Sequence, residues 1–327
     1  ELTMKKLISL ASLLIVCCAL FAPEKSPWSF SVVTDLAYYP ASAPVDGTGD
    51  RFAPITGPFS GLEARTTGWA EYTIPTPFGD NPLVKGNSLV LKGAFEFTPI
   101  SICPKFQFSF TPIAFVVLSG GVSLASGWNI PGLAMYGSTF NNNLLDPQYE
   151  ASPALSQWLF NTYFGGTFQF DVGAVWPGEW HHIVMQAYYE IKYNKLLGKT
   201  TDIYEFQNSY NRTDGWMNYQ CYTIGYQMPL VLSMVGFRAE LENHLNGSDY
   251  GNFDATYNGT FTELNLSPLM VFNLGPKDTL FTLINFASRR GYEMNVSDRN
   301  AADEMFQKFS GSEYYFKRLA FSWQHRF

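Results

Sequence analysis

Charged residues are scarce in this chain, and long apolar runs and cysteines are scarcer still. Asp, Glu, Lys and Arg make up 15% of the 327 residues, well below the roughly 25% that is typical of water-soluble domains. After the first two dozen residues, no apolar run reaches the about 18 residues that a membrane-spanning helix needs. Beyond that point the only cysteines are Cys103 and Cys221, too few for a disulfide framework. These shortages argue against an ordinary soluble surface and against helical membrane spans.

Aromatic residues and glycine are plentiful instead. Aromatics reach 17% of the chain, 27 residues are glycine, and the mean hydropathy is −0.06. A chain with this balance and no apolar blocks must interleave apolar and polar residues. A transmembrane β-barrel has such a mixture, because alternate side chains of each strand face lipid and lumen. The net charge of −7 disfavours nucleic acid as a partner.

The first 22 residues differ in kind from the rest. A basic pair at positions 5 and 6 precedes an apolar run, Leu7 to Val16, which is followed by small residues up to Ala22. This order is typical of a secretory signal peptide, so we expect residues 1–22 to be removed and residues 23–327 to form one barrel domain. Cys17 and Cys18 stand where a lipoprotein signal places its acylated cysteine, but no small residue precedes them. We therefore favour unmodified cysteines over lipidated ones.

Period-two alternation runs through most of the remaining chain. From Leu62 to Ile74, apolar or small residues at even positions oppose Glu63, Arg65 and Glu71 at odd ones, as in a strand with two different faces. The sequence predicts an all-β fold, a transmembrane antiparallel up-and-down β-barrel of about 12 strands. Ten or fourteen strands stay open, because the even count depends on dividing residues 105–128 at Pro112. In the segment that begins at Thr279, the pattern does not show which face points to the lipid. The twelve segments are Trp28–Tyr39, Leu62–Ile74, Ser88–Thr98, Lys105–Thr111, Val116–Trp128, Trp158–Ala174, His182–Tyr193, Trp216–Gln227, Leu230–Asn243, Thr260–Asn273, Thr279–Arg290 and Glu313–Phe327.

Connection lengths and tryptophans agree with that arrangement. Outer-membrane barrels have long external loops and short periplasmic turns. The predicted external connections are about residues 40–61, 129–157, 195–215, 244–259 and 291–312, with residues 99–104 as the one short exception. A Ser297 N-cap predicts a short helix within residues 297–309. Tryptophan favours membrane interfaces, and six of the eight stand at predicted strand ends: Trp28, Trp128, Trp158, Trp176, Trp180 and Trp216.

The last strand ends in an aromatic pattern. Odd positions from Tyr315 onward are apolar and oppose Arg318 and other polar residues, with Lys317 as the exception. The pattern resembles the insertion signal that the barrel-assembly machinery reads in bacterial outer-membrane proteins. That resemblance implies the assembly machinery and outer-membrane lipid as partners and the bacterial cell outer membrane as the compartment. The residues that carry it are Leu319, Phe321, Trp323 and Phe327.

Four stretches resemble a spirochaetal, treponeme-like family of outer-membrane β-barrel proteins. They are GDNPLVKGNSLVLKG at 79–93, FTPIAFVVLSGGVSLASGWNIP at 110–131, TFQFDVGAVWPGEWHHIVMQAYYEI at 167–191 and YQMPLVL at 226–232. The resemblance covers about half of the expected mature chain. It implies fold and compartment, and it carries over no functional residues.

The histidines offer little for catalysis or metal binding. His181 and His182 are adjacent, and adjacent strand residues point to opposite faces, which disfavours a shared metal ion. His244, near Ser248 and Asp249, is the external candidate for a lipid hydrolase of the Ser-His-Asp kind. We interpret His244 as a solvated loop residue and residues 246–254 as a polar turn rather than a calcium loop. We therefore expect no enzyme, no metal site and no cofactor.

The barrel lumen is the remaining candidate for function. Mixed charge inside a barrel either lines a water-filled passage that selects solutes or forms ion pairs that close the interior. The favoured hypothesis is a porin-like passive channel for small hydrophilic solutes. The alternative is a closed structural barrel, or an adhesin that binds host ligands through its external loops. The expected lumen-lining residues are Arg65, Glu71, Lys92, Glu96, Asp171, Glu190, Lys192, Arg238, Glu240, Glu242, Glu263 and Arg318.

Overall fold

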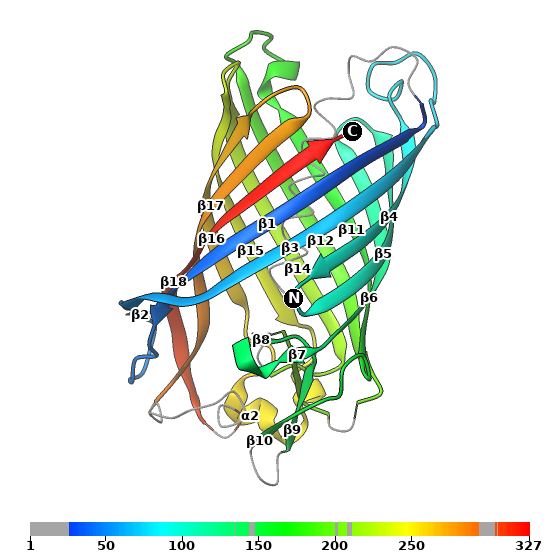
Figure 1. Ribbon diagram of the computed structural model, residues 1–327. Helices are drawn as coiled ribbons and strands as arrows, with labels where there is room; N and C mark the ends of the chain where they lie inside the picture. Colours follow the sequence, from blue (N-terminus) through cyan, green and yellow to red (C-terminus); the bar gives the residue numbers. More distant parts are fainter. Residues whose placement is uncertain are drawn as a thin grey trace.

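A closed antiparallel β-barrel makes up most of the molecule (Figure 1). The computed structural model describes residues 26–133, 135–143, 148–199, 202–207, 211–293, 305 and 307–327. In sequence order each barrel strand pairs with the next, and β1 closes the ring against β18 from the Ser31–Arg326 pair to the Tyr38–Leu319 pair. The predicted fold class and strand number are confirmed. The twelve barrel strands in the described part of the chain are β1 (Trp28–Ser42), β3 (Ile55–Pro75), β4 (Ser88–Thr98), β5 (Ser101–Ile113), β6 (Val116–Gly127), β11 (Trp158–Asp171), β12 (His182–Leu197), β14 (Gly215–Gln227), β15 (Leu232–His244), β16 (Glu263–Asn273), β17 (Asp278–Tyr292) and β18 (Phe309–Arg326).

The two ends of the barrel differ in their connections. At one end the strands are joined by turns, and the one between β11 and β12 holds the short helix η2 (Val172–Ala174). At the other end lie all the remaining small elements (Figure 1). We call the two ends the short-turn end and the long-loop end. The long-loop elements are β2 (Arg51–Ala53), β7 (Asn129–Ile130), η1 (Pro131–Leu133), β8 (Met135–Tyr136), β9 (Thr139–Asn143), β10 (Gln148–Ala151), β13 (Tyr204–Phe206), η3 (Gly247–Phe253) and α2 (Asp254–Tyr257).

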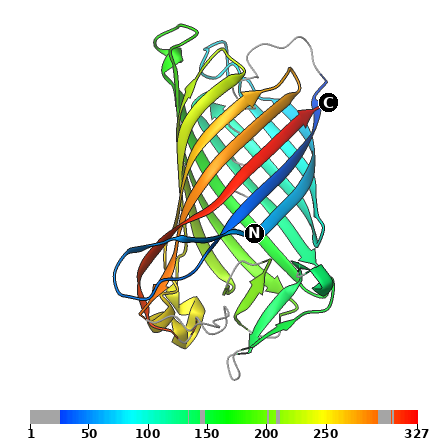
Figure 2. The same ribbon diagram turned by 60° about the vertical axis from the view of Figure 1, so that its left-hand side comes forward.

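The connection between β1 and β3 extends outward from the barrel and pairs with β18. Figure 2 shows this segment extending to one side of the long-loop end. Its short strand β2 adds in parallel to the first part of β18, with Arg51 opposite Glu313. The Arg51 Nε atom lies 3.6 Å from a Glu313 carboxylate oxygen, so an ion pair holds the connection against the barrel.

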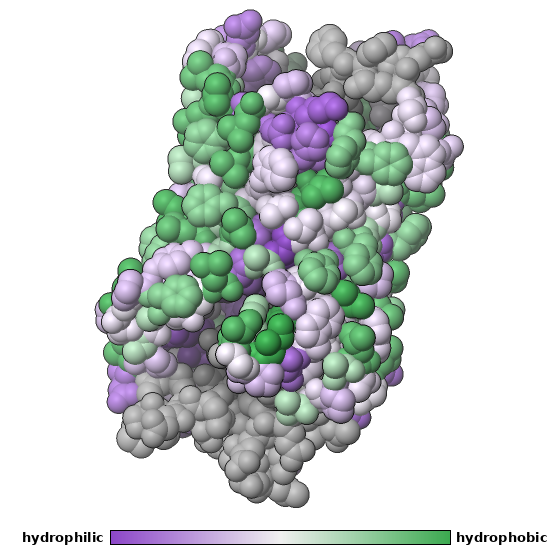
Figure 3. Space-filling view, viewed as in Figure 1, coloured by the Kyte–Doolittle hydropathy of each residue, from purple (hydrophilic) through white to green (hydrophobic). Residues whose placement is uncertain are grey.

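The barrel wall is mostly apolar outside and mostly polar inside. Along β12 the exposed side chains include Ile183, Met185 and Ile191, whereas Gln186 and Lys192 are buried. Figure 3 shows apolar side chains spread over the outer wall. This inverts the pattern of a soluble protein, and a closed barrel is one of the two folds that can satisfy every backbone hydrogen bond inside a bilayer. The protein is a bacterial outer-membrane β-barrel, and the long-loop end is its external end. No helix among the described residues is long and apolar enough to cross a membrane.

The tryptophans singled out in the sequence lie at strand ends or in the adjoining turns. Trp28 and Trp158 begin β1 and β11, and Trp128 directly follows β6. Trp176 and Trp180 are exposed in the short-turn connection between β11 and β12. These positions fit rings that settle at the two interfaces of the bilayer.

One part of the predicted alternation is wrong. Tyr315 was expected on the outer face of β18, but it pairs with the buried Ala287 of β17, and the Arg289 guanidinium lies 4.5 Å from its ring. Asn285 pairs with Arg318 and the next residue, Phe286, pairs with Phe316, so the register shifts there. A β-bulge of this kind adds one residue to one strand. It inverts the two faces of β18 on the external side of Lys317.

The segment from Thr279, whose faces were ambiguous, points Phe281 and Leu283 into the barrel. Apolar residues on both faces of this strand account for the ambiguity. Cys103 and Cys221 are both buried, and neither forms a disulfide bond within the described part of the chain. The predicted signal peptide, Cys17, Cys18 and most of the helix predicted within residues 297–309 lie outside the described residues.

Candidate functional site

The residues expected to line the lumen occupy inward positions of the barrel strands. Asp171 is at the short-turn end and Glu263 at the long-loop end, and both side chains are partly exposed. Arg65 and Glu71 are mostly buried. The other members are buried: Lys92, Glu96, Glu190, Lys192, Arg238, Glu240, Glu242 and Arg318.

One charge network follows the inner wall of four neighbouring strands, and we call it the β1–β5 network. Arg65 of β3 lies 2.5 Å from Asp35 of β1, measured from Nε to Oδ2, and 3.9 Å from Glu96 of β4. Lys105 of β5 donates to the same Glu96 at 2.5 Å. Two cations therefore face two carboxylates in alternating order along the wall. Asp35 and Lys105 were missing from the expected lumen set, although both stand at inward positions in the strand alternation.

A smaller ion pair lies nearer the short-turn end of the same wall. Lys92 Nζ of β4 is 3.2 Å from Glu71 Oε1 of β3, and the two residues face each other in the strand register. The side chains keep 11% and 13% of their surface exposed. They are thus more accessible to water than Glu96 of the β1–β5 network, whose side chain is 3% exposed.

A second charge network lies on the opposite wall, and we call it the β12–β15 network. Lys192 of β12 forms an ion pair with Glu242 of β15. Arg238, only 1% exposed, donates to Glu240 at 2.9 Å and to the Tyr219 hydroxyl at 3.2 Å. Around the barrel, β6 and β11 separate the two networks on one side, and β16, β17 and β18 separate them on the other. The lumen is therefore bounded by paired charges on two facing walls.

Arg318 of β18 makes a third polar contact near the seam that closes the barrel. Its NH1 atom lies 3.2 Å from the Tyr39 hydroxyl of β1 and 3.6 Å from a Glu63 carboxylate oxygen of β3. Tyr39 also donates a hydrogen bond to Glu63. This trio ties the last strand to the first two.

An apolar cluster also faces the lumen, toward the short-turn end. Phe281 and Leu283 of β17 pack with Leu269 and Val271 of β16 and with Met234 of β15. The sequence reasoning placed only polar residues inside and missed this cluster. The signal was present in the ambiguous faces of the Thr279 segment.

Loops cover the external mouth of the barrel. Tyr204 and Phe206 of β13 pack onto the inner wall beside Leu159 and Leu196. Ile203, from the same connection, clusters with Tyr250 and Tyr257 from the connection after β15. The Tyr250 ring is buried in this cluster, and this burial raises the pKa of its hydroxyl group. Because these side chains pack across the mouth of the barrel, the loops restrict access to the lumen from outside.

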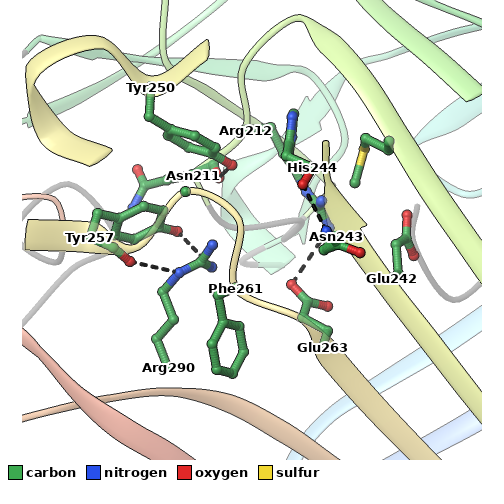
Figure 4. A pocket seen from close by; sticks show the side chains of 12 residues that line it. Asn211, Arg212, Glu242, Asn243, His244, Tyr250, Tyr257, Phe261, Glu263 and Arg290 are labelled. Atoms are coloured by element: carbon green, nitrogen blue, oxygen red, sulfur yellow. Dashed lines mark hydrogen bonds and ion pairs between the residues drawn. The ribbon is translucent and has the colours of Figure 1, made fainter. Parts of the chain in front are cut away.

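Beneath these loops lies a pocket with polar and aromatic walls (Figure 4). It has room for about one water molecule, and the wider space of about 280 Å³ includes open solvent. Figure 4 shows Arg290 beside Tyr257 and Phe261, with Arg212 and His244 on the other side of the view. The lining residues are Asn211, Arg212, Met217, Glu242, Asn243, His244, Tyr250, Tyr257, Gly259, Phe261, Glu263 and Arg290.

His244 is buried, so its interpretation as a solvated loop residue is wrong. It ends β15 with 2% of its surface exposed, and its ring packs edge-on against Tyr250 at 5.2 Å. The connection after β15 folds back over it through η3, where a polar turn was expected. Asp249 Oδ2 lies 3.6 Å from His244 Nδ1. Ser248 is exposed, and no hydrogen bond joins it to His244 among the described residues.

Arg290 is held by carbonyls and aromatic rings. Its guanidinium donates to the Tyr257 carbonyl at 2.9 Å and to the Asn258 carbonyl at 3.1 Å. It lies 4.0 Å from the Tyr257 ring and 5.1 Å from the Phe261 ring, within the range of cation–π attraction. In the described part of the chain no carboxylate lies within 4.0 Å of it. Sequence reasoning omitted this residue, because only the loop fold brings it to the lumen mouth.

The other histidines lie at the short-turn end. His182 Nδ1 is 2.7 Å from Asp171 Oδ2, and His325 Nδ1 is 2.9 Å from Asp278 Oδ1. His181 instead packs against the Trp176 ring at 4.6 Å. Across the described residues, no three His, Cys, Asp or Glu side chains are grouped to hold a metal ion.

Comparisons with known proteins give structural likenesses at low sequence identity. No family model matches the chain, and no curated protein matches it. The NanC porin is 7% identical, with a TM-score of 0.39 over 90% of this chain and 98% of its own. The translocator domain of autotransporter NalP from Neisseria meningitidis is 10% identical, with a TM-score of 0.36 over 98% of this chain and 95% of its own. The outer membrane channel DcaP of Acinetobacter baumannii is 11% identical, with a TM-score of 0.35 over 94% of this chain and 100% of its own.

Proposed function

We propose that this barrel is a narrow passive channel for small hydrophilic solutes. The observation that carries the proposal is the pair of charge networks on facing walls of the lumen, the β1–β5 network and the β12–β15 network. Fixed charges on both sides of a passage create a field that selects solutes by charge. A barrel of twelve strands lies between small, side-chain-filled barrels and wide porins.

Burial of the charged side chains favours a narrow passage. Arg238, Glu242 and Glu96 have almost no surface in contact with solvent, so the networks act as a constriction. The external loops over the mouth add a second restriction. Such a channel conducts weakly, and its conductance depends on movement of these side chains and loops.

Planar-bilayer recording on the refolded chain tests the proposal. We expect small, discrete conductance steps from protein whose folded state is verified by heat-modifiable migration on a gel. Heat-unfolded protein in the same detergent is the control and should give none. Correctly folded protein that gives no steps over a wide voltage range overturns the channel.

A closed barrel that binds ligands through its external loops is the second candidate. The observation favouring it is the packing of residues from several external segments, Ile203, Tyr250, Tyr257, Tyr292 and Met305, into one cluster. Such a barrel conducts nothing but retains binding when its loops are grafted onto another barrel. Conductance without transferable binding contradicts this candidate.

A further inference from the structure

Asparagine and glutamine side chains face the lipid at one place on the outer wall. Asn218 and Gln220 of β14 and Asn243 of β15 lie at outward positions, and each is partly exposed. Elsewhere in the described barrel strands, side chains of these two types lie at inward positions of the alternation, as Asn161 and Gln186 do. We call Asn218, Gln220 and Asn243 the amide patch.

The amide patch lies within the hydrocarbon part of the membrane. On the same face of β14, the Trp216 ring packs against the Tyr193 ring at 5.1 Å near the external end. At the short-turn end, the Tyr226 hydroxyl donates to the Trp180 carbonyl at 2.9 Å. Aromatic residues of this kind mark the two interfaces of a barrel, and a strand tilted by about 40° advances about 2.6 Å per residue across the membrane. Gln220, four residues from Trp216, is then about 10 Å deep, where it faces acyl chains rather than headgroups.

Hydrogen bonds within the amide patch leave donors unused. The Asn218 side chain donates to the Asn243 side-chain oxygen at 2.7 Å, and the Asn243 side chain donates to the His244 carbonyl at 2.8 Å. Gln220 Nε2 lies 3.5 Å from Asn218 Oδ1, and Gln220 Oε1 accepts from the Tyr222 hydroxyl at 2.8 Å. A side-chain amide has two N–H groups, so each of the three nitrogens keeps one that no hydrogen bond in the described part of the chain uses. Hydrocarbon offers no acceptor for these groups.

Other polar side chains on the outer wall differ in this respect. Thr162 of β11 donates to the Gly121 carbonyl at 3.2 Å, and Thr282 of β17 donates to the Met270 carbonyl at 3.5 Å. A hydroxyl group has a single donor, so these threonines are satisfied within the wall. The amide patch instead presents spare donors to its surroundings.

We propose that the amide patch is the contact surface for a second copy of this chain in the membrane. Both copies insert in the same direction, so the two-fold axis between them runs along the membrane normal and brings residues of equal depth together. Gln220 then faces Gln220 of the partner subunit. Each amide carries donors and an acceptor, so two equal amides hydrogen-bond to each other without any charge that would repel. The spare N–H groups thereby gain acceptors.

The surroundings of the amide patch suit such a contact. Its neighbours on the outer face include Tyr189 and Ile191 of β12 and Leu241 of β15, which are uncharged. Polar side chains that bond across an otherwise apolar interface hold membrane-spanning segments together, as they do between transmembrane helices. Association through the outer wall does not require that the lumen conducts, so the inference goes beyond the channel function.

The mass of the refolded full chain in detergent, with the bound detergent subtracted, tests the proposal. We expect a dimer. The double variant Asn218→Leu, Gln220→Leu removes two of the three amides and should raise the dissociation constant of the dimer about tenfold or more. Its folding is checked by heat-modifiable migration on a gel, and leucine suits a lipid-facing position.

A lipid-facing hydroxyl on the opposite wall provides the matched control. Thr66 of β3 lies 3.3 Å from the Thr34 hydroxyl, and Thr66→Val should dimerise like the unmodified chain. A folded, unmodified chain that stays monomeric overturns the proposal. So does a double variant that dimerises as tightly as Thr66→Val.

Crosslinking in lipid vesicles tests the symmetry of the contact. In a chain whose own cysteines are replaced by serine, Gln220→Cys should give a disulfide-linked dimer with a lipid-soluble oxidant, because equal residues meet at the axis. Thr66→Cys also faces lipid and should remain uncrosslinked. Absence of the Gln220→Cys dimer, or equal crosslinking of both variants as expected for random collisions, contradicts the proposal. Neither measurement depends on bilayer conductance, so this proposal and the channel can fail separately.

Discussion

Lys192 of β12 and Glu242 of β15 form an ion pair that passes over the strand between them, β14. Both side chains are buried. The register brings each next to β14, where Lys192 faces Met217 and Glu242 faces Tyr219. The contact therefore links strands that share no backbone hydrogen bonds and stiffens one wall of the lumen.

Breaking this pair on one side should destabilise the barrel more than removing it entirely. Lys192→Met leaves the Glu242 carboxylate buried without its cation, and loss of one partner of a buried pair costs about 3–5 kcal/mol. In the double variant Lys192→Met, Glu242→Leu we expect most of that loss to be recovered. The measurement is the free energy of unfolding in urea, in detergent. A double variant less stable than either single one contradicts the prediction.

An exposed ion pair provides the matched control. Lys308 and Glu293 lie 2.7 Å apart on the external surface. Because exposed pairs contribute about 0–1 kcal/mol, Lys308→Met should change the free energy of unfolding little.

Neutralising the two members of the Lys92–Glu71 pair should shift ion selectivity in opposite directions. Glu71→Gln leaves the Lys92 charge in the lumen and should favour anions, whereas Lys92→Gln leaves the Glu71 charge and should favour cations. The measurement is the reversal potential under a KCl gradient across a planar bilayer. Shifts of the same sign in both variants would exclude this pair as part of the conducting path.

The register shift at Lys317 predicts which neighbouring aromatic residue meets lipid. Phe316 lies on the outer side and Tyr315 on the inner side of β18. Tryptophan fluorescence of Phe316→Trp should be quenched strongly by brominated lipid, and that of Tyr315→Trp weakly, after correction for the native tryptophans. The reverse order would mean that the alternation continues without a bulge.

Asp249 should make the external loop sensitive to pH. Burial raises the pKa of its carboxyl, so the folded loop favours the protonated form. The ionised carboxylate therefore destabilises the loop at pH values above the raised pKa, and the penalty disappears as the pH falls through it. At pH 7, we expect Asp249→Asn to slow proteolytic cleavage within residues 245–262. The difference from the unmodified protein should vanish near pH 3, below the ordinary pKa of about 3.9, and its persistence there would implicate another cause.

Much of the barrel could be predicted because the alternation of a strand depends only on its own sequence. The two-residue period of Leu62–Ile74 or His182–Tyr193 reports lipid on one face and lumen on the other, whatever the neighbouring strand is. The same pattern fails at Tyr315, because one extra residue at Lys317 inverts the faces without changing the composition of the strand.

The sequence by itself determined the closed barrel, its strand number and the outer-membrane compartment, since these follow from local alternation, connection lengths and scarce charge. Only the tertiary structure decided which charges pair, because Lys192 and Glu242 meet through the shear and register of three strands. It also buried His244 and brought Arg290 to the pocket, since a loop can fold over a barrel mouth in many ways that its polar sequence does not distinguish. The residues that line the lumen could therefore be predicted from the sequence, whereas the pocket could be identified only in the folded structure.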